Sequence, residues 1–232
     1  EFVEPEPVTV EQFSLVHGRD FVDDILACRK PNGFGNRSPE IAASLPWTTG
    51  SLVSAVRHVL ENGGAACSPT SGFHHSGYKY ARAFCTFNGL MVAAVSAHSR
   101  VGRVGILDCD FHYGDGTDDI IRLQDIDYVS HLTTGSLSCK SEEFLESLPE
   151  TLAGMKADLL IYQAGADAHV DDPLGGWMTT EQMRRRDRLV FEYCHSAGIP
   201  VVWNLAGGYQ SEIQLVLDLH HATMEECLRL FS

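Results

Sequence analysis

Basic residues are scarce in this chain, since 17 Lys and Arg stand against 31 Asp and Glu, a formal net charge of −14. Nucleic-acid binders carry a basic patch or stripe, so this balance argues against direct binding to DNA or RNA. No apolar run approaches the roughly 18 residues of a membrane span, and no signal-peptide pattern is present. The composition therefore predicts a soluble globular protein without a membrane segment.

Paired cysteines are also lacking. The seven cysteines include no C-x-x-C pair, and several lie in apolar runs. This usage is typical of reduced, mostly buried thiols, so we expect a cytoplasmic protein, or a nuclear one in a eukaryotic cell. The chain begins at Glu1 rather than at a methionine, so removal of an upstream segment is one interpretation.

Short apolar runs alternate with helical patterns along most of the chain. The apolar runs predict strands at residues 65–67, 104–108, 128–131, 159–163 and 201–205. The helical patterns cover residues 48–61, 88–98, 117–122, 142–155, 180–195 and 211–230, with two short ones from Thr9 and Asp20. Residues 30–47, rich in Pro, Gly, Asn and Ser, read as a loop. Strands that are apolar on both faces predict one α/β domain over residues 1–232, a mainly parallel sheet between two helical layers.

Clusters of polar residues follow four of these runs, at the strand ends where α/β folds bind ligands. Asp108, Asp110 and His112 lie two residues apart, so on an extended backbone they project from one face. Two carboxylates and an imidazole in one small volume favour a cation such as zinc, although solvated acids at a strand end are the alternative. The other three clusters are His74-His75, Gly165-Ala166-Asp167 and Ala206-Gly207-Gly208-Tyr209.

In order and spacing, five motifs resemble those of the zinc-dependent histone deacetylase family. They are Ser71 to His75, Ala83 to Cys85, Asp108 to Gly116, Gln163 to Asp167, and Gly207 to Tyr209. The resemblance covers most of the chain. It implies the arginase-deacetylase type of fold, a three-layer α/β/α arrangement around a single sheet.

Matched residue by residue, the resemblance implies that Asp110, His112 and Asp167 hold one zinc ion per chain. Three protein ligands leave a coordination position open, as catalytic zinc sites do. A turn acid after a strand is the alternative for Asp167.

The resemblance also implies roles for the remaining polar residues. His74 and His75 match the family's paired histidines, with His75 as the proton shuttle, and Asp108 and Asp115 match the acids that orient them. Tyr209 matches the tyrosine that donates its hydroxyl to the substrate carbonyl. A metal and a phenol on either side of a carbonyl stabilise its tetrahedral state.

Two further sets of residues match less specific features. Phe84 and Leu174 match residues of the apolar tunnel that holds the acyl-lysine stem, with core packing as the alternative for both. Ser130 and the backbone near His131 match a potassium site, which also uses the backbone of Asp108, Asp110 and His112. His169 is ambiguous between the site and a packing role.

The chain departs from the family pattern at four places. The family usually begins with a strand and a loop rich in His and Pro, upstream of Glu1. The segment Thr133 to Lys140 lacks the aromatic Phe-Pro-Gly-Thr-Gly loop, so one tunnel wall is missing or replaced. Tyr113 stands where many members have a second histidine, and Ala83 where glycine is frequent. An acid on the tunnel rim has no clear match, and Glu40 and Asp23 are its only candidates.

We therefore expect a hydrolase of linear amides that removes an acetyl group from a lysine side chain in a protein or peptide, or from a related amine. In the expected mechanism zinc activates water, His75 acts as general base and acid, and Tyr209 stabilises the oxyanion. The alternatives are a deacetylase of small amines such as polyamines, an arginase-like ureohydrolase with two manganese ions, and a catalytically inactive acyl-lysine binding module.

Overall fold

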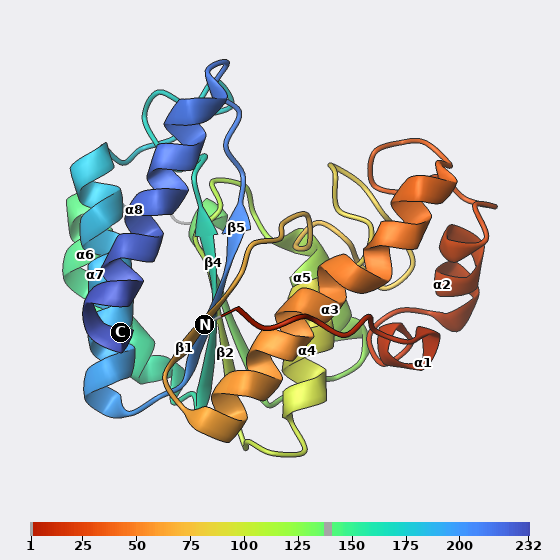
Figure 1. Cartoon of the computed structure of the whole chain (residues 1–232), viewed down its shortest axis with the longest axis horizontal. Coiled ribbons are helices and arrows are strands. Elements are labelled where there is room, and N and C mark those ends of the chain that lie inside the picture. Colours follow the sequence, from red (N-terminus) through yellow and green to blue (C-terminus); the bar gives the residue numbers. More distant parts are fainter. Residues whose placement is uncertain (1, 137–140) are drawn as a thin grey trace.

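A five-stranded parallel sheet forms the centre of the computed structural model, which describes residues 2–136 and 141–232 (Figure 1). The strand order is β1-β5-β4-β2-β3. The strands are β1 (Ala65–Ser68), β2 (Val104–Asp108), β3 (Val129–Thr133), β4 (Leu159–Gly165) and β5 (Val201–Ala206). All five predicted strands are confirmed, and none of their ends moves by more than two residues.

Helices cover both faces of this sheet (Figure 1). On one face lie α3 (Pro39–Asn62), α4 (Gly89–Ala97) and α5 (Asp115–Leu123), with α1 (Val10–Phe13) and α2 (Arg19–Leu26) packed beyond them. On the other lie α6 (Ser141–Met155), α7 (Thr180–Ala197) and α8 (Ile213–Phe231). Successive residues of β2 pack on opposite faces of the sheet: Ile106 packs in the core with α3 and α4, and Leu107 packs in the core with α6 and α7. The predicted three-layer parallel fold is confirmed.

The long helix α3 corrects the prediction of a loop over residues 30–47. It begins at Pro39, because Ser38 Oγ accepts the Ile41 N–H at 3.2 Å and caps the first turn. Pro46 lies inside the helix, where it cannot donate a helical hydrogen bond. Its carbonyl accepts from Val8 N at 3.0 Å, which ties the N-terminal segment to α3. The loop prediction, made from the many Pro, Gly, Asn and Ser residues of this segment, placed the predicted start of the helix nine residues too late.

The described part of the chain contains no helix that is both long enough and apolar enough to span a membrane. Six of the seven cysteines are free, four of them buried, as expected. Cys139 lies outside the described residues, as does the end of the segment from Thr133 to Lys140 that lacks the family's aromatic loop.

Two glycines let strand ends approach each other closely: Gly165 brings the end of β4 to the turn after β2, and Gly207 brings the end of β5 to Asp167. A Cβ at Gly165 would overlap Cys109 O, and a Cβ at Gly207 would overlap the Asp167 carboxylate. Gly207 also has φ +53°, a backbone conformation that other residues rarely adopt. The polar clusters that follow these strands therefore lie together at one edge of the sheet.

A buried ion pair joins α7 to the end of β4. Arg186 and Asp187 are 0% and 1% exposed. Arg186 Nε donates to Asp187 Oδ1 at 2.8 Å, and Nη1 donates to Gly165 O at 3.0 Å. Asp187 also accepts hydrogen bonds from Tyr162 of β4 and from Thr223 of α8. Asp187 therefore connects α7, α8 and β4, the strand that leads to Asp167.

We expect Asp187→Ala to lower the free energy of unfolding by about 3–5 kcal/mol, because it leaves the buried Arg186 charge unpaired. Urea unfolding measures the change. Glu225→Ala is the matched control, since Glu225 pairs with Arg184 at a partly exposed position between the same two helices. Its effect should stay within about 0.5 kcal/mol. Equal effects of the two variants would contradict a structural role for the buried pair.

Candidate active site

Three candidate metal ligands meet where β2 and β4 end. The donor atoms of Asp110, His112 and Asp167 all lie within 4.8 Å of one another. His112 Nδ1 is 2.9 Å from Asp110 Oδ1 and 3.0 Å from Asp167 Oδ2. Both carboxylates are buried, at 3% and 0% exposure, so two negative groups face each other with little water. This donor set fits a divalent cation such as zinc, which takes carboxylate and imidazole ligands.

Main-chain N–H groups orient these carboxylates. His112 N donates to Asp110 Oδ1 at 2.8 Å, and Phe111 N donates to Asp167 Oδ1 at 3.0 Å. Asp110 N donates in turn to Asp108 Oδ1 at 3.1 Å. The turn after β2 therefore wraps around the acids and fixes them from one side.

His112 and Asp110 both have raised pKa values. Hydrogen bonds to Asp110 and then to Asp167 raise the pKa of His112 to about 10. Burial raises the pKa of Asp110 to about 7. A cation that binds these three residues must therefore displace at least one proton near neutral pH.

The structure brings the two predicted His–Asp pairs together beside this group. His74 Nδ1 lies 2.7 Å from Asp108 Oδ2, and His75 Nδ1 lies 2.6 Å from Asp115 Oδ1. The two imidazole rings are 4.1 Å apart, and the His75 ring is 6.0 Å from that of His112. Each ring is thus held through Nδ1 by its own carboxylate, which fixes its orientation.

The two histidines differ in pKa. Burial alone would lower the pKa of His74, but the carboxylates of Asp108 and Asp110 outweigh it and raise the pKa to about 9. For His75, burial and the positive charge of His74 lower the pKa below its ordinary value, despite Asp115. His74 therefore favours the charged form near neutral pH, and His75 favours the neutral form.

Two residues behind Asp115 escaped the sequence analysis. Asp115 Oδ2 accepts from Tyr80 Oη at 3.1 Å and also from Arg82 Nη2. The charge of Arg82 contributes to lowering the pKa of His75. Tyr80 and Arg82 stand between the His74-His75 motif and Phe84, and that position was the only signal for them in the sequence.

The side chain of His131 also escaped prediction. Its Nδ1 lies 2.7 Å from Asp118 Oδ1, and its Nε2 lies 3.9 Å from Asp108 Oδ2. Tyr113, at the position where many family members have histidine, donates to the other oxygen of Asp118. A line of polar groups therefore runs from the buried Asp108 to the exposed Tyr113.

The predicted potassium group combines Ser130 and the backbone near His131 with the backbone of Asp108, Asp110 and His112. In the sheet register Ser130 pairs with Gly105, whereas Thr133 pairs with Asp108. Since successive side chains alternate between faces, the Ser130 side chain projects to the face of the sheet opposite the Asp108 side chain. The His131 side chain approaches Asp108, with Nε2 3.9 Å from Asp108 Oδ2. The potassium site stays a prediction.

Tyr209 faces the metal-ligand group from the end of β5. Its ring is 6.3 Å from that of His112 and 6.4 Å from that of Phe84. Tyr209 N donates to Asp172 Oδ2 at 2.8 Å, a contact that the sequence did not predict. Burial raises the pKa of Tyr209 above its ordinary value, so the hydroxyl keeps its proton.

The candidate tunnel residues lie at the surface. Phe84 is 53% exposed and Leu174 is 52% exposed, so core packing does not explain either of them. Leu174 N donates to Asp172 Oδ1 at 2.9 Å, so Asp172 holds both Leu174 and Tyr209. Phe84 thus lies beside Tyr209 with an exposed ring, Leu174 shares Asp172 with Tyr209, and the tunnel role of both residues stays a prediction.

The remaining candidates have structural partners. The two nitrogens of His169 contact Thr180 Oγ1 and Asp171 N, so this residue braces its own loop. Glu40 accepts from Ser38 on α3, and Asp23 pairs with Arg19 on α2. These contacts tie the two candidate rim acids to their own helices.

A family model, described as histone deacetylase domain, matches residues 1–134 and 136–224. The chain belongs to this family. A probable deacetylase from Methanothermobacter thermautotrophicus is 26% identical over 91% of this chain and 75% of that protein. The solved HDA15 HD domain is 20% identical with a TM-score of 0.81, covering 97% of this chain and 77% of that one.

A second solved structure, an acetylpolyamine aminohydrolase from Burkholderia pseudomallei, is 18% identical with a TM-score of 0.75. It covers 97% of this chain and 85% of that one. Both structures share the fold of this histone deacetylase-family chain, which confirms the predicted fold. The match to the family model confirms the predicted family.

We expect zinc binding to release protons, because the pKa of His112 is about 10 and that of Asp110 about 7. Affinity should rise about tenfold per pH unit for each proton released as the pH increases from about 6 to about 8. Calorimetry in buffers of different ionisation enthalpy counts these protons. Asp110→Asn, which removes one carboxylate, should weaken binding throughout this range. An affinity that does not depend on pH would contradict this assignment.

Proposed function

We propose that this chain is a metal-dependent amidohydrolase that removes an acetyl group from a lysine side chain or a related amine. One observation carries the proposal: a three-ligand metal group, a carboxylate-held imidazole and a tyrosine converge at one edge of the sheet. The His75 and Tyr209 rings lie within 6.0 Å and 6.3 Å of the His112 ring. Family membership supports the same class of reaction.

Asp110, His112 and Asp167 would hold one zinc ion. When bound, such a cation supplies Lewis-acid chemistry, which polarises an amide carbonyl and makes water acidic enough to lose a proton near neutral pH. The three residues contribute two negative charges and one neutral imidazole.

His75 is the proposed proton shuttle. Asp115 holds its Nδ1, which leaves Nε2 as the nitrogen that exchanges protons with the reactants. Its lowered pKa keeps it neutral near pH 7, so it can accept a proton from water. It then donates that proton to the departing amine. His74, whose pKa is raised, contributes positive charge beside it.

Tyr209 is the proposed oxyanion stabiliser. The amide oxygen gains negative charge as the carbonyl becomes tetrahedral, so a phenol hydroxyl stabilises that state more than the ground state. The raised pKa of Tyr209 keeps the hydroxyl protonated for this purpose. The hydrogen bond from Tyr209 N to Asp172 fixes the residue at the end of β5.

Two of the alternatives fit less well. A ureohydrolase requires two bridged metal ions, whereas residues 2–136 and 141–232 contain a single group of three or more candidate ligands. An inactive binding module does not require an oriented His75 and a protonated Tyr209, and this chain has both.

A small acetylated amine such as a polyamine is the second candidate substrate. The net charge of −14 favours cationic substrates, which include acetylated polyamines as well as lysine-rich peptides. The exposed Phe84 and Leu174 leave the rim accessible to either. An activity screen of acetyl-lysine peptides against acetylated polyamines, with zinc content measured on the same sample, distinguishes the two.

We expect Tyr209→Phe to lower kcat for the better substrate about 10²–10³-fold, because one oxyanion donor is lost. Zinc content should stay unchanged, since Tyr209 is not among the three ligands. Asp110→Ala should lose both zinc and activity. Steady-state kinetics with metal analysis checks both variants, and full activity in either would refute the proposed mechanism.

We also expect the acid limb of the kcat/KM profile to fall below about pH 6.5, the ordinary pKa of histidine, because the pKa of His75 is lowered. Activity should therefore be lost as the pH falls and His75 gains a proton. Arg82→Gln should move this limb to higher pH, since it removes a positive charge behind Asp115. The control is Lys79→Gln. Lys79 lies in the same loop as Arg82 but pairs with Asp20 on α2, so this change should leave the acid limb in place.

A further inference from the structure

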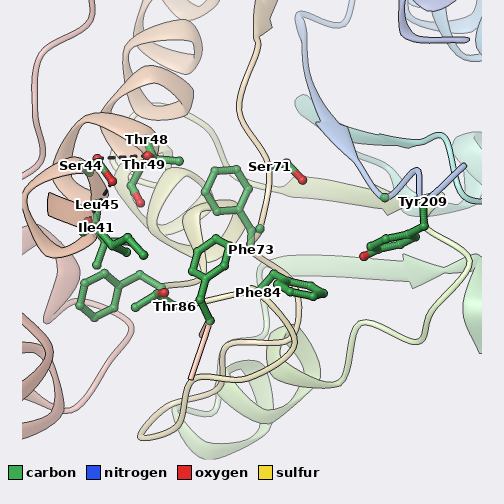
Figure 2. Close-up of a pocket in the computed structure, with 14 residues that line it drawn as sticks. Ile41, Ser44, Leu45, Thr48, Thr49, Ser71, Phe73, Phe84, Thr86 and Tyr209 are labelled. Carbon is green, nitrogen blue, oxygen red and sulfur yellow. Dashed lines mark hydrogen bonds between the residues drawn. The ribbon is translucent and has the colours of Figure 1, made fainter. Parts of the chain in front are cut away.

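A cavity of about 410 Å³ lies beside Tyr209, between the end of β5 and the first half of α3 (Figure 2). Phe73, which directly precedes the His74-His75 pair, lies at the centre of the cavity. Phe84 lies between Phe73 and Tyr209. In Figure 2 the Tyr209 hydroxyl points toward Phe84 and the cavity. The cavity therefore adjoins the position where Tyr209 would meet a reacting carbonyl.

The walls of this cavity are apolar or carry uncharged hydroxyls. Phe73, Phe87, Ile41 and Leu45 form the apolar part. Three of these hydroxyls have partners in the protein: Ser44 Oγ donates to Ile41 O at 2.8 Å, Thr48 Oγ1 donates to Ser44 O at 3.1 Å, and Thr86 Oγ1 accepts from Gly33 N at 3.0 Å. None of the described residues that line it carries a charge, although the chain has a net charge of −14. Such a cavity accepts an apolar group and excludes an ammonium group.

The two substituents of the substrate carbonyl also differ in polarity: one is cationic or polar, and the other is apolar. The amine side continues into a peptide or a cationic polyamine, which must remain in contact with water. Its path therefore runs past the exposed Phe84 and Leu174. The acyl side is a hydrocarbon chain, and it matches the uncharged cavity on the far side of Phe84.

The cavity is also much larger than acetyl requires. A methyl group is about as large as a water molecule, which takes up about 30 Å³ in the liquid. A volume of about 410 Å³ accommodates a chain of several methylenes. It falls within the range of about 300–1,000 Å³ typical of small-molecule sites.

We propose that this cavity is an acyl-chain pocket, so that the enzyme removes linear acyl groups of about hexanoyl size and prefers them to acetyl. This inference rests on the proposed amide hydrolysis at the same site. It adds a preference for longer acyl groups over acetyl, which the candidate ligand residues do not specify.

The test compares kcat/KM on one peptide that carries acetyl-, butanoyl-, hexanoyl- or octanoyl-lysine, with zinc-loaded protein. Burial of each methylene raises kcat/KM up to about fourfold. Hexanoyl-lysine should therefore exceed acetyl-lysine by at least about tenfold. An acetyl-lysine value equal to or above the hexanoyl value would overturn the proposal.

A pair of variants on α3 links the preference to the cavity. Thr48→Phe places a ring at the cavity wall and should lower the hexanoyl-to-acetyl ratio of kcat/KM by at least about tenfold. Ala43→Phe adds the same ring to the same helix at an exposed position that does not line the cavity. It should leave the ratio unchanged.

The outcomes separate this inference from the function on which it rests. If no acyl length is hydrolysed by the zinc-loaded protein, the proposed hydrolysis itself is wrong. If acetyl-lysine is hydrolysed but the longer acyl groups are not, only the acyl-chain pocket is wrong. A hexanoyl preference that survives Thr48→Phe would also overturn the assignment to this cavity.

Discussion

Three buried carboxylates at the ends of two neighbouring strands are the constraint on which the rest of the site depends. Asp108, Asp110 and Asp167 are 0%, 3% and 0% exposed, and negative charges with so little water must be compensated. Main-chain N–H groups compensate in part, and so do the Gln163 amide and the imidazoles of His74 and His112. The negative charge that these groups leave uncompensated makes Asp110, His112 and Asp167 suitable ligands for a cation.

Different surroundings give the two neighbouring histidines different pKa values. Asp108 and Asp110 outweigh burial and raise the pKa of His74. Burial, the charge of His74 and that of Arg82 lower the pKa of His75, despite its hydrogen bond with Asp115. One motif of two adjacent histidines thereby yields one charged and one neutral group. This difference makes His75 the better proton acceptor.

The first turns of α3 extend the site beyond the strand ends. Ser38 caps a helix that continues through Pro46, and residues from its first half form the cavity wall opposite Tyr209. The candidate catalytic residues thus lie at the edge of the sheet, and part of the cavity wall beside them comes from a helix.

The sequence by itself determined the strands and the parallel sheet, because apolar runs are local properties of the chain, and the family resemblance of its motifs implied the two His–Asp pairs. Only the tertiary structure decided which distant groups meet. Arg82 reaches Asp115, and Asp172 reaches Tyr209, across 33 and 37 residues of sequence. Strand register decided that Ser130 faces away from Asp108 while His131 faces toward it. Packing kept Pro46 inside α3. Such outcomes depend on contacts between segments, which residue spacing does not encode.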